Sequence, residues 1–502
     1  MKKYNISFNL RYLCLLLVVT GGMAMPETID SQASVTTPCS CGSFTTIGVT
    51  GDKTYMSGLS SFNSSNCYFI KGDLVIDTAT FWTGLRLKME EGSRILVLAD
   101  LSISNCFISG CGDMWQGIHS NGQVDIQIYD STVEGAEFGF KLKTTAGFVA
   151  LQTHFINNYI GITTASPFET DGQDKVIHRG QIEGCHFYTS GTLPDPYPGQ
   201  FYYPSWPTSP TGIPYNQGFA AIYLSRTVGL NVGSEKATGT KRNKIHDMRN
   251  GVILRDQTVS HIGGTDIKDL EGTRVGNHFG NVRDLNQYAI HMYRVVSDIQ
   301  KDTIKNAMVG IYGFQSANAT IQKNYISIAT PGSTYGATLG IRLITPQKAN
   351  ITQNKIYEGM RGIFIEDVSI DFLIQDNDLT TTFYFGGINI RIFIMNAKLD
   401  PTQGHIVNND LVIDDALSST GIHAINANRL WIEDNDIEFF NDEEHQTRGI
   451  LGVGMYSSRV TGNVVYRDGE EVLEGNNGIQ LENSGFNTVF CNSTDNFWIN
   501  LN

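Results

Sequence analysis

The sequence predicts an all-β protein, a parallel β-helix solenoid of about 13 coils. Three observations predict this fold: a short motif that recurs along most of the chain, a second motif that alternates with it, and a fixed distance between the two. In the first motif, a glycine or alanine precedes an apolar residue, most often isoleucine. Its occurrences are Gly117-Ile118, Gly139-Phe140, Gly161-Ile162, Ala221-Ile222, Gly251-Val252, Ala289-Ile290, Gly310-Ile311, Gly340-Ile341, Gly362-Ile363, Gly387-Ile388, Gly421-Ile422, Gly449-Ile450 and Gly478-Ile479.

The second motif is a segment of alternating polar and apolar residues that ends in asparagine. The asparagines are Asn324, Asn354, Asn377, Asn409, Asn435, Asn463 and Asn492. From Gly310 to Asn324 is 14 residues, and Gly340 to Asn354 is also 14. From an asparagine to the next motif glycine the distance varies: it is 8 residues for Asn354, 12 for Asn409 and 15 for Asn463. One arc of each repeat is therefore constant, and the other accepts insertions, as packed elements and surface loops do.

The local period of two indicates short strands. One such unit cannot bury its own apolar face, but stacked units can, with like residues about 4.8 Å apart. No segment shows the sustained 3.6-residue period of a helical solenoid, and the leucine frame of leucine-rich repeats is absent. We expect the seven asparagines to form a structural ladder. Each would tolerate left-handed backbone at a turn, and its amide would bond to the asparagines of neighbouring coils.

Composition limits the classes of function. The chain has 502 residues and a net charge of −14, which argues against a nucleic-acid partner. The same charge makes a highly anionic polymer a poor default partner unless cations intervene. Only 17% of the residues are charged and 52 are glycine, so a protein of charged helices is excluded.

The first residues resemble an export signal, which predicts a secreted or cell-surface protein. Lys2, Lys3 and Arg11 precede a short apolar stretch, and small residues around Ala24 would provide the cleavage site. The alternative is a retained N-terminal anchor. No later stretch is long enough to span a membrane.

The predicted organisation is a signal peptide at 1–24, an N-terminal segment and cap at 25–66, and the β-helix at 67–502 with an insertion at about 188–218. An exported chain can keep disulfides. Cys106 and Cys111 are close enough in sequence to pair around a turn, and Cys39, Cys41 and Cys67 cluster near the start.

The segments Gly72–Asp77, Asn105–Cys111 and Met114–Ile118, with the repeats that follow, resemble exported right-handed, single-stranded parallel β-helix proteins of the pectin-lyase-like superfamily. The resemblance covers roughly Cys67 to Asn502. It implies the fold, but not one function, because this scaffold carries lyases, hydrolases, adhesins and inert stalks.

The catalytic pattern of the β-helix polygalacturonases is not met. Gly404-His405-Ile406 lacks the second glycine of their Gly-His-Gly motif, and Asp414-Asp415 follows that histidine instead of preceding it. The catalytic residues are therefore unknown. Our leading interpretation is an exported structural or adhesive protein that binds a polysaccharide or a surface protein. The alternative is a polysaccharide lyase or glycoside hydrolase on the same scaffold.

Two candidate sites follow from the repeats. Asp378, Asp410 and Asp436 each follow a ladder asparagine and would form an acidic column. Calcium is the candidate cofactor there because it accepts several carboxylates, whereas the simpler interpretation is a solvated acidic edge.

The second candidate is the insertion at about 188–218, which is rich in proline and aromatic residues. Tyr202, Tyr203 and Trp206 could stack on sugar rings or on a partner. The alternative is that these rings cover the wall of the solenoid.

Overall fold

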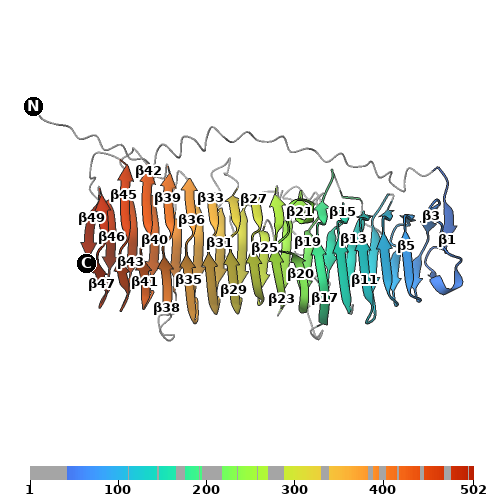
Figure 1. Cartoon of the computed structure of the whole chain (residues 1–502), viewed down its shortest axis with the longest axis horizontal. Coiled ribbons are helices and arrows are strands. Elements are labelled where there is room, and N and C mark those ends of the chain that lie inside the picture. The colour runs from blue at the N-terminus through green and yellow to red at the C-terminus, as the bar shows by residue number, and fades with distance from the viewer. Residues whose placement is uncertain are drawn as a thin grey trace, which may run out of the picture. The chain divides into compact units, whose positions relative to one another are not determined.

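The computed structural model describes residues 42–110, 112–143, 146–164, 176–191, 193–194, 218–234, 236–256, 258–268, 288–328, 338–382, 388–394, 403–414, 418–440, 446–468, 476–495 and 497–501. In these ranges the chain forms three parallel β-sheets and two 3₁₀ turns, η2 (Met56–Gly58) and η3 (Gly239–Lys241). Between the first and last coils, each coil contributes one strand to each sheet in turn, and Figure 1 shows the strands following one another from β1 to β49.

Sheet A contains 17 strands among the described residues. They are β1 (Thr45–Ile47), β3 (Cys67–Ile70), β6 (Arg86–Met89), β9 (Phe107–Gly110), β12 (Thr132–Glu134), β15 (His154–Ile156), β18 (His186–Tyr188), β21 (Asn243–His246), β24 (Thr265–Lys268), β27 (Thr303–Ala307), β30 (Tyr325–Ile328), β33 (Lys355–Gly359), β36 (Asp378–Thr382), β39 (Asp410–Asp414), β42 (Asp436–Phe440), β45 (Val464–Asp468) and β48 (Ser493–Asp495).

Sheet B also contains 17 strands within the described ranges. They are β2 (Lys53–Tyr55), β4 (Asp73–Ile76), β7 (Arg94–Val97), β10 (Trp115–Ser120), β13 (Ala136–Leu142), β16 (Ile160–Thr163), β19 (Ala220–Ser225), β22 (Asn250–Arg255), β25 (Tyr288–Tyr293), β28 (Val309–Phe314), β31 (Leu339–Ile344), β34 (Arg361–Glu366), β37 (Ile388–Phe393), β40 (Ser418–Ile425), β43 (Gln446–Val453), β46 (Asn477–Glu482) and β49 (Trp498–Leu501).

Sheet C contains 15 strands among the residues that the structure describes. They are β5 (Thr80–Thr83), β8 (Leu101–Ser104), β11 (Asp125–Tyr129), β14 (Gly147–Leu151), β17 (Val176–Glu183), β20 (Thr227–Gly233), β23 (Val259–Gly263), β26 (Val296–Gln300), β29 (Asn318–Gln322), β32 (Lys348–Thr352), β35 (Asp371–Gln375), β38 (Gln403–Val407), β41 (Leu430–Glu433), β44 (Arg459–Thr461) and β47 (Thr488–Phe490).

The all-β parallel β-helix predicted from the repeats is confirmed, with more coils than the motif marks. The coils of β2, β4, β7 and β49 lack the glycine–isoleucine motif, but these strands still pair with their neighbours in sheet B. Strand pairing also begins before Cys67, since β1 and β2 pair with β3 and β4. Part of the segment predicted as an N-terminal cap therefore already contributes strands.

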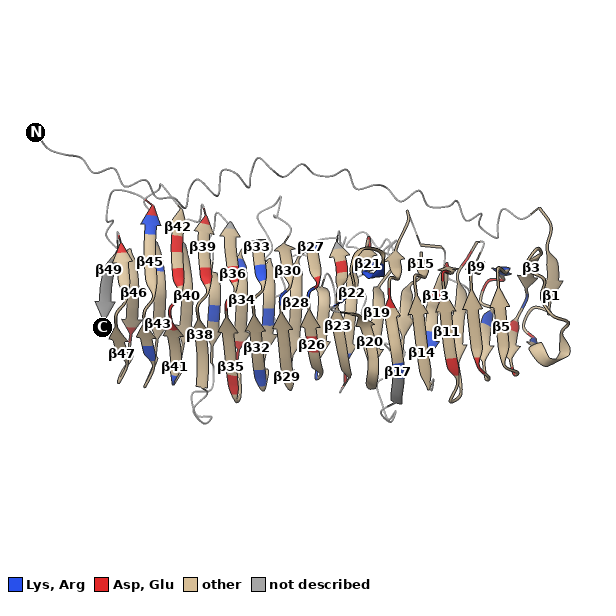
Figure 2. Ribbon diagram, viewed as in Figure 1, with Lys and Arg blue, Asp and Glu red and all other residues tan. Residues whose placement is uncertain are grey.

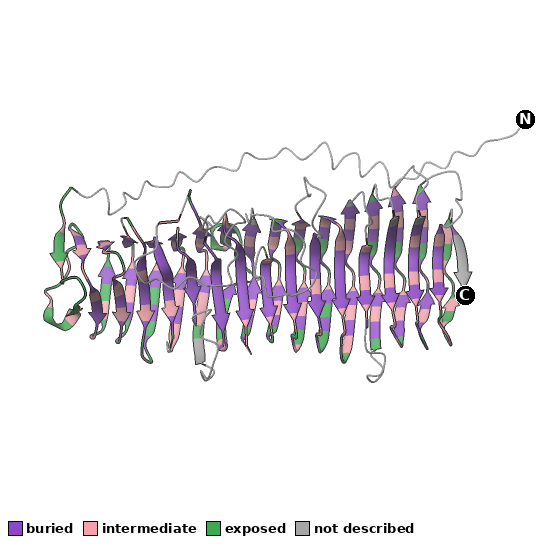
Figure 3. Ribbon diagram, turned by 180° about the vertical axis from the view of Figure 1, so that it is seen from behind, coloured by how far each residue is buried: buried purple, intermediate pink, exposed green. Residues whose placement is uncertain are grey.

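The core is a set of stacked aliphatic residues. In sheet B, Ile290, Ile311, Ile341 and Ile363 lie in register and are fully buried. Figure 3 shows that buried residues run along the strands of successive coils. Each such side chain contributes about 1.5–3 kcal/mol on burial.

The glycine of the first motif has a steric cause. A Cβ on Gly310 would lie 2.6 Å from the carbonyl oxygen of Gly340 and 2.8 Å from Ile326 Cγ2. The next coil and the facing sheet thus leave no room for a side chain. One assignment of the motif is wrong: Ile363 and Ile422 pair with Ile390, so this coil carries Asn389-Ile390 and not Gly387-Ile388.

The asparagines stack at the turn between sheets C and A. The Nδ2 atom of Asn354 donates to Oδ1 of Asn377 at 3.0 Å, and Asn377 donates to Asn409 at 2.9 Å. The same bond joins Asn324 to Asn354, Asn409 to Asn435, Asn435 to Asn463 and Asn463 to Asn492.

The expected left-handed backbone lies one residue earlier than the ladder position. Lys323, Gln353 and Asp376, each directly before a ladder asparagine, have φ values of 56°, 57° and 54°. The asparagine itself turns inward, where its amide can serve as a buried bonding group.

Two cysteines occupy the ladder position in earlier coils. Cys106 and Cys185 are buried free thiols, whereas Cys67 is disulfide-bonded. The predicted pairing of Cys106 with Cys111 is wrong, because the Cys106 sulfur faces the backbone of Leu85 and Ser104 at 3.4 and 3.3 Å.

Asp302 takes the place of an asparagine in one coil. Its Oδ1 accepts from the Thr265 amide at 2.8 Å, while Oδ2 is buried without a hydrogen-bond partner. Burial raises the pKa of Asp302 to about 8. A protonated carboxyl can donate as an amide does, so the neutral acid fits the ladder better than the anion.

Replacing Asn409 with alanine is expected to lower the free energy of unfolding by about 2–4 kcal/mol. The change removes the acceptor of the Asn377 backbone and side-chain NH groups, at 3.1 and 2.9 Å. Chemical denaturation followed by circular dichroism measures this loss. Asn350→Ala is the control, since Asn350 is exposed on sheet C, and an equal loss for both variants would contradict the ladder's role.

Asp302→Asn is expected to remove a decline in stability with pH. The native pKa of about 8 lies above the ordinary 3.8, so between these values the native state holds a proton that the unfolded state has lost. Stability therefore falls as pH rises through this window. Melting curves at several pH values should show a smaller fall in the free energy of unfolding for Asp302→Asn than for the wild type. At pH 8 the two falls should differ by more than about 1 kcal/mol. Parallel pH profiles for the two proteins would contradict this.

Candidate functional site

The outer face of sheet B carries a column of aromatic and basic side chains. In each coil the residue after the inward isoleucine points outward. The strand register then aligns six such residues, which we call the outer column. They are His291, Tyr312, Arg342, Phe364, Arg391 and His423.

Three guanidinium groups surround one ring in this column. Arg342, Arg361 and Arg391 lie 5.3, 5.5 and 5.0 Å from the ring centroid of Phe364, which is 5% exposed. These distances are those of cation–π contacts. We call these residues, with Glu366, the arginine cluster.

The charges of the arginine cluster are only partly compensated. Arg342 forms an ion pair with Glu366 at 2.7 Å. The Nε atoms of Arg361 and Arg391 are buried and have no hydrogen-bond partner. Burial, followed by the charges of Arg391 and Arg342, lowers the pKa of Arg361. An unmatched buried donor is costly, so this geometry favours an anionic ligand.

Stacked rings continue the column on the N-terminal side. Tyr312 lies 4.9 Å from Tyr288 and 5.3 Å from His291, measured between ring centroids. The Tyr312 hydroxyl and His291 Nδ1 are buried without a hydrogen-bond partner. Burial lowers the pKa of His291 to about 3 and raises that of Tyr312. Both side chains are therefore neutral near pH 7, and each has one polar atom left for a ligand.

His423 extends the column on the C-terminal side. Burial, then the charges of Arg391 and Arg448, lowers its pKa to about 4. His291, at the other end of the column, is only 5% exposed, because the neighbouring rings cover it.

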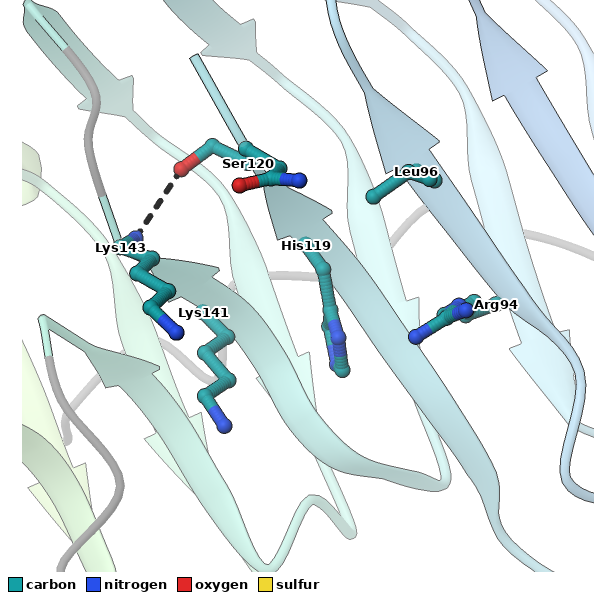
Figure 4. A pocket seen from close by; sticks show the side chains of 7 residues that line it. Arg94, Leu96, His119, Ser120, Lys141 and Lys143 are labelled. Atoms are coloured by element: carbon teal, nitrogen blue, oxygen red, sulfur yellow. Dashed lines mark hydrogen bonds between the residues drawn. The ribbon is translucent and has the colours of Figure 1, made fainter. Parts of the chain in front are cut away.

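A basic pocket of about 210 Å³ lies on the same sheet in earlier coils. Figure 4 shows the His119 ring between Arg94 and Lys141, with Lys143 nearby. Arg94 is paired with Asp73 at 2.8 Å, and burial lowers the pKa of His119 to about 4. The lysines give this pocket a positive charge, so sheet B presents basic groups at two places.

Asp378, Asp410 and Asp436 lie side by side on sheet A, in consecutive coils. Partial burial, then the charges of Asp378 and Asp436, raises the pKa of Asp410. Figure 2 shows the acidic bands on β39 and β42. Lys355 precedes Asp378 in the same column. Its Nζ atom lies 3.7 Å from Asp378, which also accepts from the Tyr357 hydroxyl at 2.7 Å.

No group of three His, Cys, Asp or Glu residues in the described ranges is arranged to hold a metal ion. Calcium at the aspartate column remains a prediction. Tyr202, Tyr203 and Trp206 lie outside the described residues, as do residues 1–24, which were predicted to be a signal peptide, and Cys111.

Residues 228–391 match the family model described as a right handed beta helix region. The chain is a right-handed parallel β-helix. The match covers the central coils, including Arg342, Arg361, Phe364 and Arg391. No curated protein matches the chain. Among the residues that the structure describes, no helix is long and apolar enough to cross a membrane.

Sequence reasoning missed the arginine cluster, although a signal was present. Arg342 follows Gly340-Ile341, and Arg391 follows Asn389-Ile390, at the same position of the motif. Assigning the motif of the β37 coil to Gly387-Ile388 displaced its register by two residues. Arg391 was therefore not recognised as a member of the outer column. With the register corrected, Arg342, Phe364 and Arg391 fall in one column.

If the aspartate column binds calcium, CaCl₂ should raise the melting temperature of the protein, and Asp410→Asn should abolish that rise, because Asp410 is the central carboxylate. Differential scanning calorimetry at matched ionic strength, with NaCl as the control salt, makes this comparison. A rise that is the same in NaCl, or that persists in Asp410→Asn, would favour the solvated acidic edge.

Proposed function

We propose that this protein is a secreted or cell-surface module that binds acidic polysaccharide chains along the outer face of sheet B. The observation that carries the proposal is the pair of buried, unpartnered guanidinium nitrogens of Arg361 and Arg391 beside the Phe364 ring. Guanidinium forks match the geometry of carboxylate and sulfate groups, and aromatic faces suit the apolar side of a sugar ring.

The local charge reconciles this proposal with the net charge of −14. Within β31, β34 and β37, Arg342, Arg361 and Arg391 face a single carboxylate, Glu366. An acidic polymer would meet positive charge here, although the net charge of the whole chain is negative. Such a field restricts binding to one face and makes it sensitive to salt.

Catalysis on the same face is the second candidate. Hydrolysis of a glycosidic bond requires two carboxyl groups about 5–9.5 Å apart. The arginine cluster offers Glu366, which Arg342 already engages at 2.7 Å. Binding is therefore the better-supported function. Arg361, whose pKa is lowered by burial, would be the candidate base of a lyase.

Arg361→Met and Arg391→Met are each expected to weaken binding to carboxylated or sulfated glycans at least about tenfold, since a charge-assisted hydrogen bond contributes about 1.5–3 kcal/mol. A glycan array that includes neutral glycans, followed by titration of the hits, measures this. Reducing-sugar release from each hit would shift the assignment to an enzyme.

The matched control is Arg86→Met, which removes the same charge from an exposed site on sheet A. Both cluster variants should melt at or above the wild-type temperature, because each removes a buried donor that lacks a partner. Unchanged binding with unchanged melting would overturn the proposal, as would an equal effect of Arg86→Met.

A further inference from the structure

Two histidines of adjacent coils meet on the outer face of sheet A, far in sequence from the arginine cluster. His186 lies on β18 and His246 on β21, which pair in parallel. Their Nε2 atoms are 2.7 Å apart. The His246 side chain is 22% exposed, so small solutes can reach the pair.

A carboxylate fixes the orientation of one ring. The Nδ1 atom of His246 lies 2.5 Å from Oδ2 of Asp247. Because the carboxylate is an acceptor, Nδ1 of His246 carries the proton and donates it, which leaves a lone pair on Nε2. His186 then donates from its own Nε2. Two imidazole nitrogens therefore converge on one point.

Neighbouring rings hold this arrangement. The rings of Tyr188 and His246 are stacked, with centroids 5.1 Å apart and an interplanar angle of 13°. The ring centroid of His154 lies 5.4 Å from that of His186. The charged groups near the pair are Asp247, the exposed Lys244 on β21, and Asp266 on β24, which is paired with Arg242 at 2.7 Å. The two rings are thus preoriented by packing on both sides.

We propose that His186 and His246 form a binding site for a divalent transition metal such as Zn²⁺, Ni²⁺ or Cu²⁺. Imidazole nitrogen suits these ions, whereas Ca²⁺ and Mg²⁺ require oxygen ligands. The carboxylate behind His246 corresponds to the partner that metal-ligating histidines commonly have, and it fixes the orientation of the ring.

The geometry needs only a small adjustment. Two nitrogens bound to one tetrahedral zinc at about 2.0–2.1 Å lie roughly 3.3 Å apart. The present separation of 2.7 Å must open by about 0.6 Å, which small rotations of both side chains provide. Water completes the coordination, since no described group of three His, Cys, Asp or Glu residues encloses the position.

Titration calorimetry of the untagged protein with ZnCl₂ and NiCl₂ tests the site. We expect saturable binding of one ion and an increase in melting temperature, neither of which CaCl₂ produces. His186→Asn and His246→Asn should each abolish binding. Asp247→Asn should weaken it at least about tenfold, because the carboxylate that orients the His246 ring is lost.

His405→Asn is the matched control, because His405 lies on sheet C beside Trp431 and away from the pair. It should bind as the wild type does. Copper-bound protein should show nitrogen hyperfine coupling in its electron paramagnetic resonance spectrum, and this signal should be lost in both histidine variants. No heat at millimolar metal, or binding that survives either histidine variant with an unchanged melting temperature in the absence of metal, would overturn the proposal.

Discussion

Among the described residues, each strand between the terminal coils depends on the coil before and the coil after it for its backbone hydrogen bonds. Because pairing is parallel and in register, residues at the same position of successive coils lie in one column at about 4.8 Å spacing. Isoleucines stack inside, asparagines stack at one turn, and arginines and rings stack outside. The register is therefore the constraint that creates both the core and the candidate sites.

The asparagine ladder shows how that constraint is satisfied at a buried turn. Asn377 donates to Asn409 and to the Ile351 carbonyl, so its amide serves two coils at once. Where the column has a thiol or a carboxyl group, only part of this bonding is kept: the Cys185 thiol donates to the Ala150 carbonyl, and Oδ1 of Asp302 accepts from the Thr265 amide. The column therefore tolerates other side chains that can bond to a neighbouring coil.

The sequence was sufficient to predict the fold because inward positions repeat the same chemistry in every coil. The glycine at position 310 and the isoleucine after it are dictated by contacts with the neighbouring coil, so their spacing is visible without coordinates. Outward positions are free of that restriction. Arg342, Phe364 and Arg391 share a column but not a residue type, and a displacement of two residues at Gly387 was enough to separate them. The His186–His246 contact was equally hidden, because the two histidines are 60 positions apart in the sequence.

Neighbour-only contact also determines how the two proposed sites relate. In a stack of this kind, each coil contacts only the adjacent ones, and β18 and β21 are separated from β31, β34 and β37 by intervening coils. No two-state element is common to both sites, so ligand binding at one site is not expected to change the affinity of the other. The coils of the solenoid can therefore carry separate binding sites, and a substitution that creates or removes one proposed site should leave the other unchanged.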